Sequence, residues 1–188
     1  MTLKVQVIAA STREGRKGFP VAQWAMDQVR AHAKFDAELV DLREVALPLF
    51  DEPKHPRFAD YAHEHTRRWS AIVQRADAFV FVTPEYDHGP PASLLNALQY
   101  LVKEWAYKPA GFVSYGGVSA GVRSVAGLKP VVCALKMMPM VEAVAIPFFA
   151  QHLDEASGRF DPGEVQAKAA VAMLDELHRW AGALRTLR

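Results

Sequence analysis

A polar loop near the start of the chain holds the first residues whose types and spacing favour ligand chemistry. It reads Ser11-Thr12-Arg13-Glu14-Gly15-Arg16-Lys17-Gly18 and lies between a β-branched run and a helical pattern. Free backbone N–H groups at a helix N-terminus bind anions, and Arg13 and Arg16 are suited to bidentate pairing with a phosphate. A nucleoside-triphosphate loop requires Gly-Lys-Ser/Thr, and a dinucleotide loop requires three spaced glycines. Neither pattern is present, so the loop favours a phosphate monoester, with a merely solvated loop as the alternative.

Two more loops follow strongly apolar runs. Residues 83–91 contain three prolines and Gly89, a stiff turn whose backbone groups have few internal partners. Such free N–H and C=O groups suit a planar heterocycle, and the alternative is a rigid connector without a ligand. Residues 114–121 contain adjacent glycines, which allow close approach of a ligand, and Tyr115, which offers a ring for stacking. The alternative for residues 114–121 is a flexible turn without a ligand. His88 is a candidate general base, although nothing in the sequence places a partner beside it.

The elements that must position these loops are short strands alternating with amphipathic helices. Apolar runs predict five strands, at residues 5–10, 38–42, 78–82, 110–114 and 141–146. Apolar residues at helical spacing predict five helices, with stripes that begin at Val21, Trp69, Leu94, Val125 and Met173. Pro130 lies inside the fourth stripe and predicts a kink or a late helix start.

This alternation is typical of an α/β fold with a parallel sheet between two helical layers. Five strands favour the flavodoxin-like order 2-1-3-4-5, a three-layer sandwich, over the six-stranded dinucleotide-binding order. Ligands of such sheets bind beyond the carboxyl ends of the strands. We therefore expect the loops after the first, third and fourth strands to meet at one edge.

Composition narrows the class of protein further. The chain has 188 residues, 22 Lys+Arg and 21 Asp+Glu, which predicts one domain over residues 1–188 and argues against a nucleic-acid binder. Cys133 is the single cysteine, so an internal disulfide and a cysteine-based metal site are excluded. No apolar run approaches the roughly 20 residues that span a bilayer. Met1–Lys4 lead into a strand-like run without a signal pattern, so we expect a cytoplasmic location and no membrane contact.

Several motifs in order along the chain carry a family resemblance. They are Ser11-Thr12-Arg13-x-Gly15-Arg16, Thr83-Pro84-Glu85-Tyr86, Asn96-Ala97-Leu98, Lys108-Pro109, and Ser114-Tyr115-Gly116-Gly117 followed by Arg123. In this set the chain resembles the NADPH-dependent FMN reductase family, which includes small quinone, azo-dye and chromate reductases. The resemblance extends from the first strand to about Pro147.

The resemblance implies FMN as the cofactor and assigns residues to it. Those around the phosphate and ribityl tail would be Ser11, Thr12, Arg13, Arg16, Gly18 and Phe19. Those along the isoalloxazine edge, mostly through backbone groups, would be Pro84, Glu85, Tyr86 and Asp87. Those beside the pyrimidine side would be Tyr115, Gly116 and Gly117. No catalytic side chain is required, because the flavin carries out the redox chemistry.

The resemblance also implies the reaction and the assembly. NADPH or NADH would give hydride to FMN, and a quinone, azo compound, free flavin or similar small acceptor would then take the electrons. The family is typically dimeric, which predicts a homodimer or homotetramer. A flavodoxin-like binding or scaffold protein without redox activity is the alternative. A one-electron carrier is disfavoured because such proteins tend to be strongly acidic, whereas the net charge here is +1.

The chain departs from the family pattern at four positions. Asp87 stands where the family usually has Asn, and its negative charge beside the ring is expected to weaken FMN binding or lower the reduction potential. Leu95 replaces Lys and Gln99 replaces Asp, so both partners of a possible ion pair are absent together. Ala10 replaces the first-strand glycine.

Other conspicuous residues have structural interpretations. His63 and His65 are expected on different faces of a solvated helix start, without the further ligands of a metal site. Cys133, Trp69, Trp180 and the methionines at 137, 138 and 140 are expected in the core. Trp105 and Tyr107 are candidates for a dimer interface or a pocket wall. Arg185 and Arg188 are expected in a frayed, solvated end.

Overall fold

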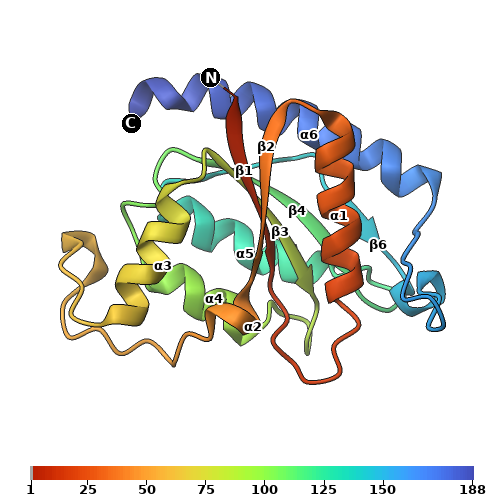
Figure 1. The fold of residues 1–188 in the computed structure, drawn as a ribbon, viewed down its shortest axis with the longest axis horizontal. Helices are drawn as coiled ribbons and strands as arrows, with labels where there is room; N and C mark the ends of the chain where they lie inside the picture. Colours follow the sequence, from red (N-terminus) through yellow and green to blue (C-terminus); the bar gives the residue numbers. More distant parts are fainter. Residues whose placement is uncertain (1) are drawn as a thin grey trace.

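The fold is a parallel sheet between two helical layers, as a computed structural model that describes residues 2–188 shows (Figure 1). The strands are β1 (Leu3–Ala9), β2 (Phe35–Asp41), β3 (Ala78–Pro84), β4 (Pro109–Tyr115), β5 (Met138–Pro139) and β6 (Val144–Ile146). Their order is β2-β1-β3-β4-β5, with β6 also paired to β4. The predicted flavodoxin-like order is therefore confirmed, with one short strand added.

Two predicted strands differ from the structure. β2 begins at Phe35, three residues before the expected start, because Leu3 of β1 already pairs with Phe35. The run 141–146 is not one strand. Pro139 pairs with Ala110, the chain then leaves the sheet at the exposed Val141, and it returns where Val144 pairs with Val113.

The helices pack on both faces of the sheet and create two separate apolar cores (Figure 1). α1 (Phe19–His32) and α6 (Glu164–Leu184) cover one face, and α3 (Glu64–Gln74), α4 (Ala92–Gln99) and α5 (Val122–Ala134) cover the other. Shorter helical turns are α2 (Leu42–Val45), η1 (Pro56–Phe58), η2 (Phe149–His152) and η3 (Arg185–Leu187). Strands covered on both faces are largely apolar, and β3 is buried over all seven residues, with Thr83 as its one polar side chain.

α5 corrects two expectations about the fourth stripe. The helix begins at Val122 and continues through Pro130, so the proline does not delay its start. Leu128 and Val132 are buried, but Cys133 is exposed. A residue directly after a stripe position points about 100° away from it, so the prediction of a buried Cys133 was wrong.

Three further expectations also need correction. Trp69 is fully buried as expected, but Trp180 is 36% exposed on α6. Trp105 is fully buried against Trp69 and Phe79, so it contributes neither to an interface nor to a pocket wall. Arg188 is not frayed, because its guanidinium donates to Tyr107 O and to Asp77.

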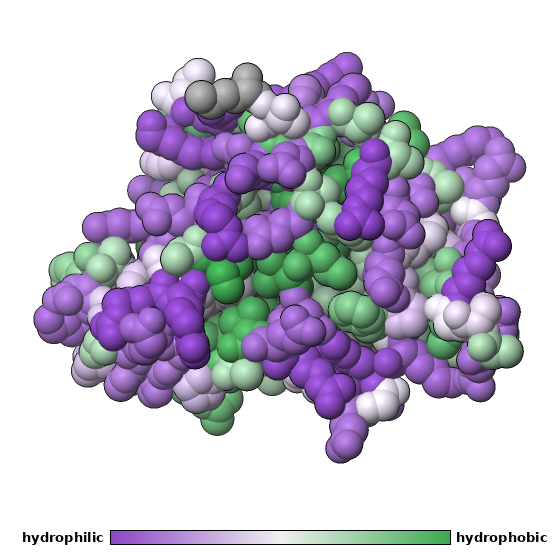
Figure 2. Space-filling view, viewed as in Figure 1, coloured by the Kyte–Doolittle hydropathy of each residue, from purple (hydrophilic) through white to green (hydrophobic). Residues whose placement is uncertain are grey.

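The surface is polar with local apolar areas. Figure 2 shows hydrophilic side chains around an apolar area near the middle of the face drawn. Within residues 2–188, no helix is long and apolar enough to cross a membrane.

Candidate functional site

The three predicted loops meet in a cleft of about 330 Å³ beyond the carboxyl ends of β1, β3 and β4. The cleft is lined by Ser11, Arg13, Gly15, Arg16, Lys17, Gly18, Pro84, Glu85, Tyr86, Tyr115, Gly116, Gly117 and Phe149. Ten of the predicted cofactor residues are among them, whereas Thr12, Phe19 and Asp87 are not. Phe149 was missed, because it follows β6 in a turn that no sequence pattern links to the loops.

The first loop has the donor set of an anion site. Among residues 2–188, no acceptor receives the backbone N–H groups of residues 11–15 and 17–19, whereas Arg16 N donates to Arg13 O at 3.3 Å. Arg13 is exposed and has no carboxylate partner in the described chain, and Lys17 pairs with Glu155. Unpaired N–H groups beside α1 and a free guanidinium fit a phosphate monoester.

Arg16 is engaged by a carboxylate. Its Nη1 donates to Asp41 Oδ1 at 2.6 Å and to Ser11 O at 2.5 Å, and its Nη2 pairs with Asp41 Oδ2. Hydrogen bonding to Asp41 raises the pKa of the Arg16 guanidinium. The pair is largely buried, with side chains 11% and 5% exposed. Arg16 therefore ties the first loop to the end of β2, and a direct bond to phosphate stays a prediction.

The second loop contains a two-residue hairpin turn. Gly89 N donates to Tyr86 O at 2.9 Å, and Tyr86 N donates to Gly89 O at 3.0 Å. The two residues between them, Asp87 and His88, have φ of 48° and 66°. Asn and Asp adopt this left-handed conformation more readily than most residues. Asp87 therefore preserves the turn that an Asn would form, and it is exposed outside the cleft lining.

Glu85 binds the third loop. Its carboxylate accepts hydrogen bonds from Ser119 Oγ at 3.0 Å, Arg123 N at 3.1 Å and Arg123 Nη1 at 2.7 Å. Burial alone would raise the pKa of Glu85, but the bonds from Arg123 and Ser119 outweigh it and lower that pKa. The side chain therefore joins the loops after β3 and β4, and Glu85 N adds a hydrogen bond to Tyr115 O at 3.3 Å.

Tyr115 forms the inner wall of the cleft. A Cβ placed on Gly18 would lie 1.8 Å from Tyr115 Oη, so only glycine allows the two loops to approach this closely. The ring packs against Phe149, with centroids 4.9 Å apart. Burial raises the pKa of the Tyr115 hydroxyl, which therefore stays protonated at neutral pH. Across the cleft, Ser11 Oγ and Tyr86 Oη lie 2.7 Å apart and connect the first two loops.

A second cleft of about 410 Å³ lies beside the first loop. It is lined by Thr12, Leu42, Arg43, Ala46, Leu47, Leu49, Ala92, Ser93, Asn96 and Ala97. Asn96, from the predicted motif, fixes this wall by accepting from Phe50 N at 2.9 Å and donating to Pro48 O at 2.7 Å. Leu95 packs against the core and Gln99 is exposed, so neither lines the predicted cofactor cleft.

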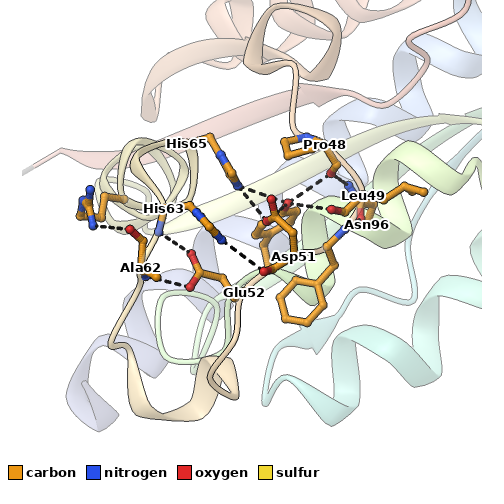
Figure 3. Close-up of polar contacts among 11 residues, drawn as sticks. Pro48, Leu49, Asp51, Glu52, Ala62, His63, His65 and Asn96 are labelled. Carbon is orange, nitrogen blue, oxygen red and sulfur yellow. Dashed lines mark hydrogen bonds and ion pairs between the residues drawn. The ribbon is translucent and has the colours of Figure 1, made fainter.

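The two histidines lie together rather than on different faces (Figure 3). His63 precedes α3 in extended conformation, and its ring stacks on His65 with centroids 5.1 Å apart. Both rings contact Asp51, through its carbonyl and its Oδ1. Glu52 accepts from Ala62 N and His63 N and so holds the segment that leads into α3. Residues 2–188 contain no group of three or more His, Cys, Asp or Glu suited to hold a metal ion.

Comparisons with known proteins identify the family of the chain. The family described as NADPH-dependent FMN reductase matches residues 3–151. The NAD(P)H-dependent FMN reductase C4B3.06c of Schizosaccharomyces pombe is 40% identical over 151 residues, which covers 78% of this chain and 75% of that protein. The NAD(P)H-dependent FMN reductase LOT6 of Saccharomyces cerevisiae is 38% identical over 146 residues, which covers 72% and 76%.

Solved structures share the fold. FerB, a flavoenzyme NAD(P)H:(acceptor) oxidoreductase from Paracoccus denitrificans, superposes with a TM-score of 0.74 at 23% identity over 96% of this chain and 98% of that one. A Streptococcus pneumonia flavodoxin superposes with a TM-score of 0.57 at 13% identity over 93% and 97%. With the profile match over most of its length, the chain belongs to the NADPH-dependent FMN reductase family.

Proposed function

We propose that the protein is an FMN-dependent NAD(P)H oxidoreductase that reduces a quinone, azo compound, free flavin or similar small acceptor. The observation that carries this proposal is the donor set of the first loop, where unpaired N–H groups and Arg13 form an anion cradle beside Tyr115. Relatives named 2-hydroxy-1,4-benzoquinone reductase (Burkholderia) and quinone reductase (Pseudomonas putida) are 31% and 30% identical over 62% and 58% of this chain. They support a quinone as the first acceptor to test.

The residues around the cleft would hold FMN in three parts. The first loop, from Ser11 to Phe19, would bind the phosphate and ribityl tail, with Arg16 fixing the loop through Asp41. Pro84–Asp87 would face the edge of the isoalloxazine ring. Tyr115, Gly116 and Gly117 would line its pyrimidine side. When bound, FMN supplies hydride acceptance from the nicotinamide and electron transfer to the acceptor.

The protein's own groups position and shield the reacting ring. Glu85 is occupied by Ser119 and Arg123, so it is not a free base in the cleft. Tyr115 presents a protonated hydroxyl and an aromatic face, which excludes water from the inner wall. Hydride transfer from the nicotinamide to the flavin needs no proton from a protein side chain, so we propose no catalytic residue.

The test is the visible absorption spectrum of the purified protein before and after incubation with FMN and desalting. We expect flavin absorption bands at about 370 and 450 nm. We also expect the protein to oxidise NADPH or NADH when a quinone is present. A protein that remains colourless and whose melting temperature does not respond to FMN would overturn the proposal in favour of the scaffold alternative. Comparing the two nicotinamides in the same assay identifies the preferred donor.

We further propose a cytoplasmic homodimer or homotetramer. The support for the assembly is a set of exposed apolar side chains on one segment of the chain. Leu49, Phe50 and Phe58 are 82%, 41% and 56% exposed, and exposed apolar surface of this kind is typical of protein–protein contacts. Light scattering after size-exclusion chromatography should give two or four times the monomer mass, and Leu49→Ser with Phe58→Ser should reduce it.

A further inference from the structure

A separate cavity of about 630 Å³ lies at the edge of the sheet opposite the cofactor cleft. Its walls come from the turn before β3, the loop before β4, the turn after α5 and the segment at Arg188. β3 and β4 are each seven residues long. At roughly 3.3 Å per residue, the cavity and the cofactor cleft are separated by about 20 Å. It therefore forms no part of the proposed flavin site.

Three lysines line this cavity without a carboxylate partner in the described part of the chain: Lys103, Lys108 and Lys136. Lys108 is 5% exposed. Its Nζ donates to Val73 O at 3.0 Å and Gln74 O at 3.4 Å, which caps the end of α3. An ammonium has three donors, and within residues 2–188 the third N–H of Lys108 finds no oxygen or nitrogen acceptor, although Nζ lies 5.5 Å from the centroid of the Phe79 ring.

The two carboxylates in the cavity wall are already occupied. Asp77 Oδ1 accepts from Arg188 Nη1 at 2.8 Å. Glu104 accepts from Tyr61 Oη at 2.8 Å and from Ser70 Oγ at 2.6 Å. Neither carboxylate forms an ion pair with a lysine of the cavity. Because the donors to Glu104 are neutral, its carboxylate keeps a negative charge that attracts Lys108. The three lysine charges therefore exceed the one cavity carboxylate that has no cationic partner.

The rest of the wall is apolar and firmly held. Ala59, Ala106 and Leu187 contribute apolar surface, and Tyr107 contributes an aromatic ring with Lys136 Nζ 5.6 Å from its centroid. Tyr107 N donates to Lys136 O at 2.9 Å, and Tyr107 O accepts from Arg188 Nε at 3.1 Å. These bonds fix the wall in place without a ligand.

We propose that this cavity binds a small organic anion with an apolar body. Its carboxylate or phosphate group would lie between Lys103, Lys108 and Lys136, and its apolar part would lie against Tyr107 and Leu187. Capping α3 explains Lys108 alone. It does not explain why two further lysines without carboxylate partners surround the same cavity.

Protonation of Lys108 gives the proposal a second readout. Burial, and then the charge of Arg188, lower the pKa of Lys108 to about 8. The charged side chains that share the cavity with it are Arg75, Asp77, Lys103, Glu104, Lys136 and Arg188. An anion binds the protonated form of Lys108 more tightly, so its affinity should fall as the pH rises through about 8.

The experiment is calorimetric titration of the FMN-saturated protein with 1-naphthyl phosphate, with neutral 1-naphthol and inorganic phosphate as comparisons. Excess FMN keeps the probe out of the cofactor cleft. We expect saturable binding of 1-naphthyl phosphate, at least about tenfold tighter than that of either comparison, because each supplies only half of the interaction. A phosphate monoester is a dianion above pH 7, so a decline between pH 7 and 9 reports on the protein.

Lys103→Met with Lys136→Met should weaken binding by about tenfold or more while NADPH oxidation stays unchanged. Lys129→Met is the matched control, because Lys129 lies on α5 and does not line the cavity. No saturable binding, equal binding of 1-naphthol, or unchanged affinity in the double variant would each overturn the proposal. Because the readout is binding to this cavity, failure of the flavin activity would not be mistaken for failure here.

Discussion

Replacing Asp41 by Asn tests whether the buried ion pair with Arg16 organises the cofactor loop. The two side chains are 11% and 5% exposed, and Asp41 Oδ1 also accepts from Arg43 N at 3.0 Å. Leaving one partner of such a pair without its counter-charge costs about 3–5 kcal/mol. Because Asn retains one oxygen acceptor, we expect a loss of about 2–3 kcal/mol in the free energy of unfolding.

Asp36→Asn provides a control on the same strand. Its carboxylate lies 3.7 Å from Lys4 Nζ, and both side chains are more than half exposed. Exposed pairs contribute less than about 1 kcal/mol. Urea unfolding followed by circular dichroism, at one protein concentration, measures both variants. A difference of less than about 0.5 kcal/mol between them would refute the organising role of the pair.

The same variant should also bind FMN more weakly. Arg16 Nη1 holds Ser11 O at 2.5 Å, so loss of Asp41 frees the loop that carries the unpaired N–H groups. The entropy cost of ordering that loop would then reduce the free energy of FMN binding. Tighter FMN binding in Asp41→Asn would contradict this reasoning, because it would show that Asp41 withholds Arg16 from the phosphate.

Four further substitutions test the cleft. Arg13→Ala should weaken FMN by about 1–3 kcal/mol, the scale of a lost charged hydrogen bond, and unchanged affinity in a fluorescence titration would remove Arg13 from the phosphate site. Gly18→Ala should reduce FMN binding because its Cβ has no room, whereas Gly182→Ala, with open space around it, should not. Asp87→Asn should tighten FMN binding, because it removes the negative charge expected beside the ring. It should leave the melting temperature unchanged, since both residues suit a φ of 48°; looser binding would give Asp87 a role of its own. Glu85 has a lowered pKa, so its contribution to stability is present above its ordinary pKa of 4.5 and is lost as the pH falls through the lower folded value. Glu85→Gln should therefore be destabilised at pH 7 and approach the wild type in acid, as thermal melts across that range would show.

The sequence predicted the sheet well because its central strands are apolar on both faces. β1, β3 and β4 contain almost only buried residues, so continuous apolar runs identify them without ambiguity. The last strand was harder, since two short pairings with β4 are separated by an exposed residue, Val141. A continuous run of apolar residues in the sequence does not indicate where the chain leaves the sheet.

Side-chain partners were predictable only in part. The loop containing Arg16 was recognised as an anion site, but its partner Asp41 lies 25 residues away and is brought near by the register that pairs Ala9 with Asp41. His63 was expected to point away from His65 on a helix. The chain is still extended at His63, so the two rings can stack.

The position of α6 has a consequence for synthesis of the chain. Met173, Leu174 and Leu177 complete the core on one face of the sheet, where they pack with Val5, Val80 and the other residues of that face. The sheet approaches α6 closely, since a Cβ on Gly111 would lie 2.9 Å from Met173 Sδ. All five longer elements of that layer and sheet precede α6 in the sequence. At about 5–20 residues per second, a ribosome therefore leaves this face of the nascent sheet covered by α1 alone for several seconds, and the apolar surface that α6 will bury is exposed during that interval.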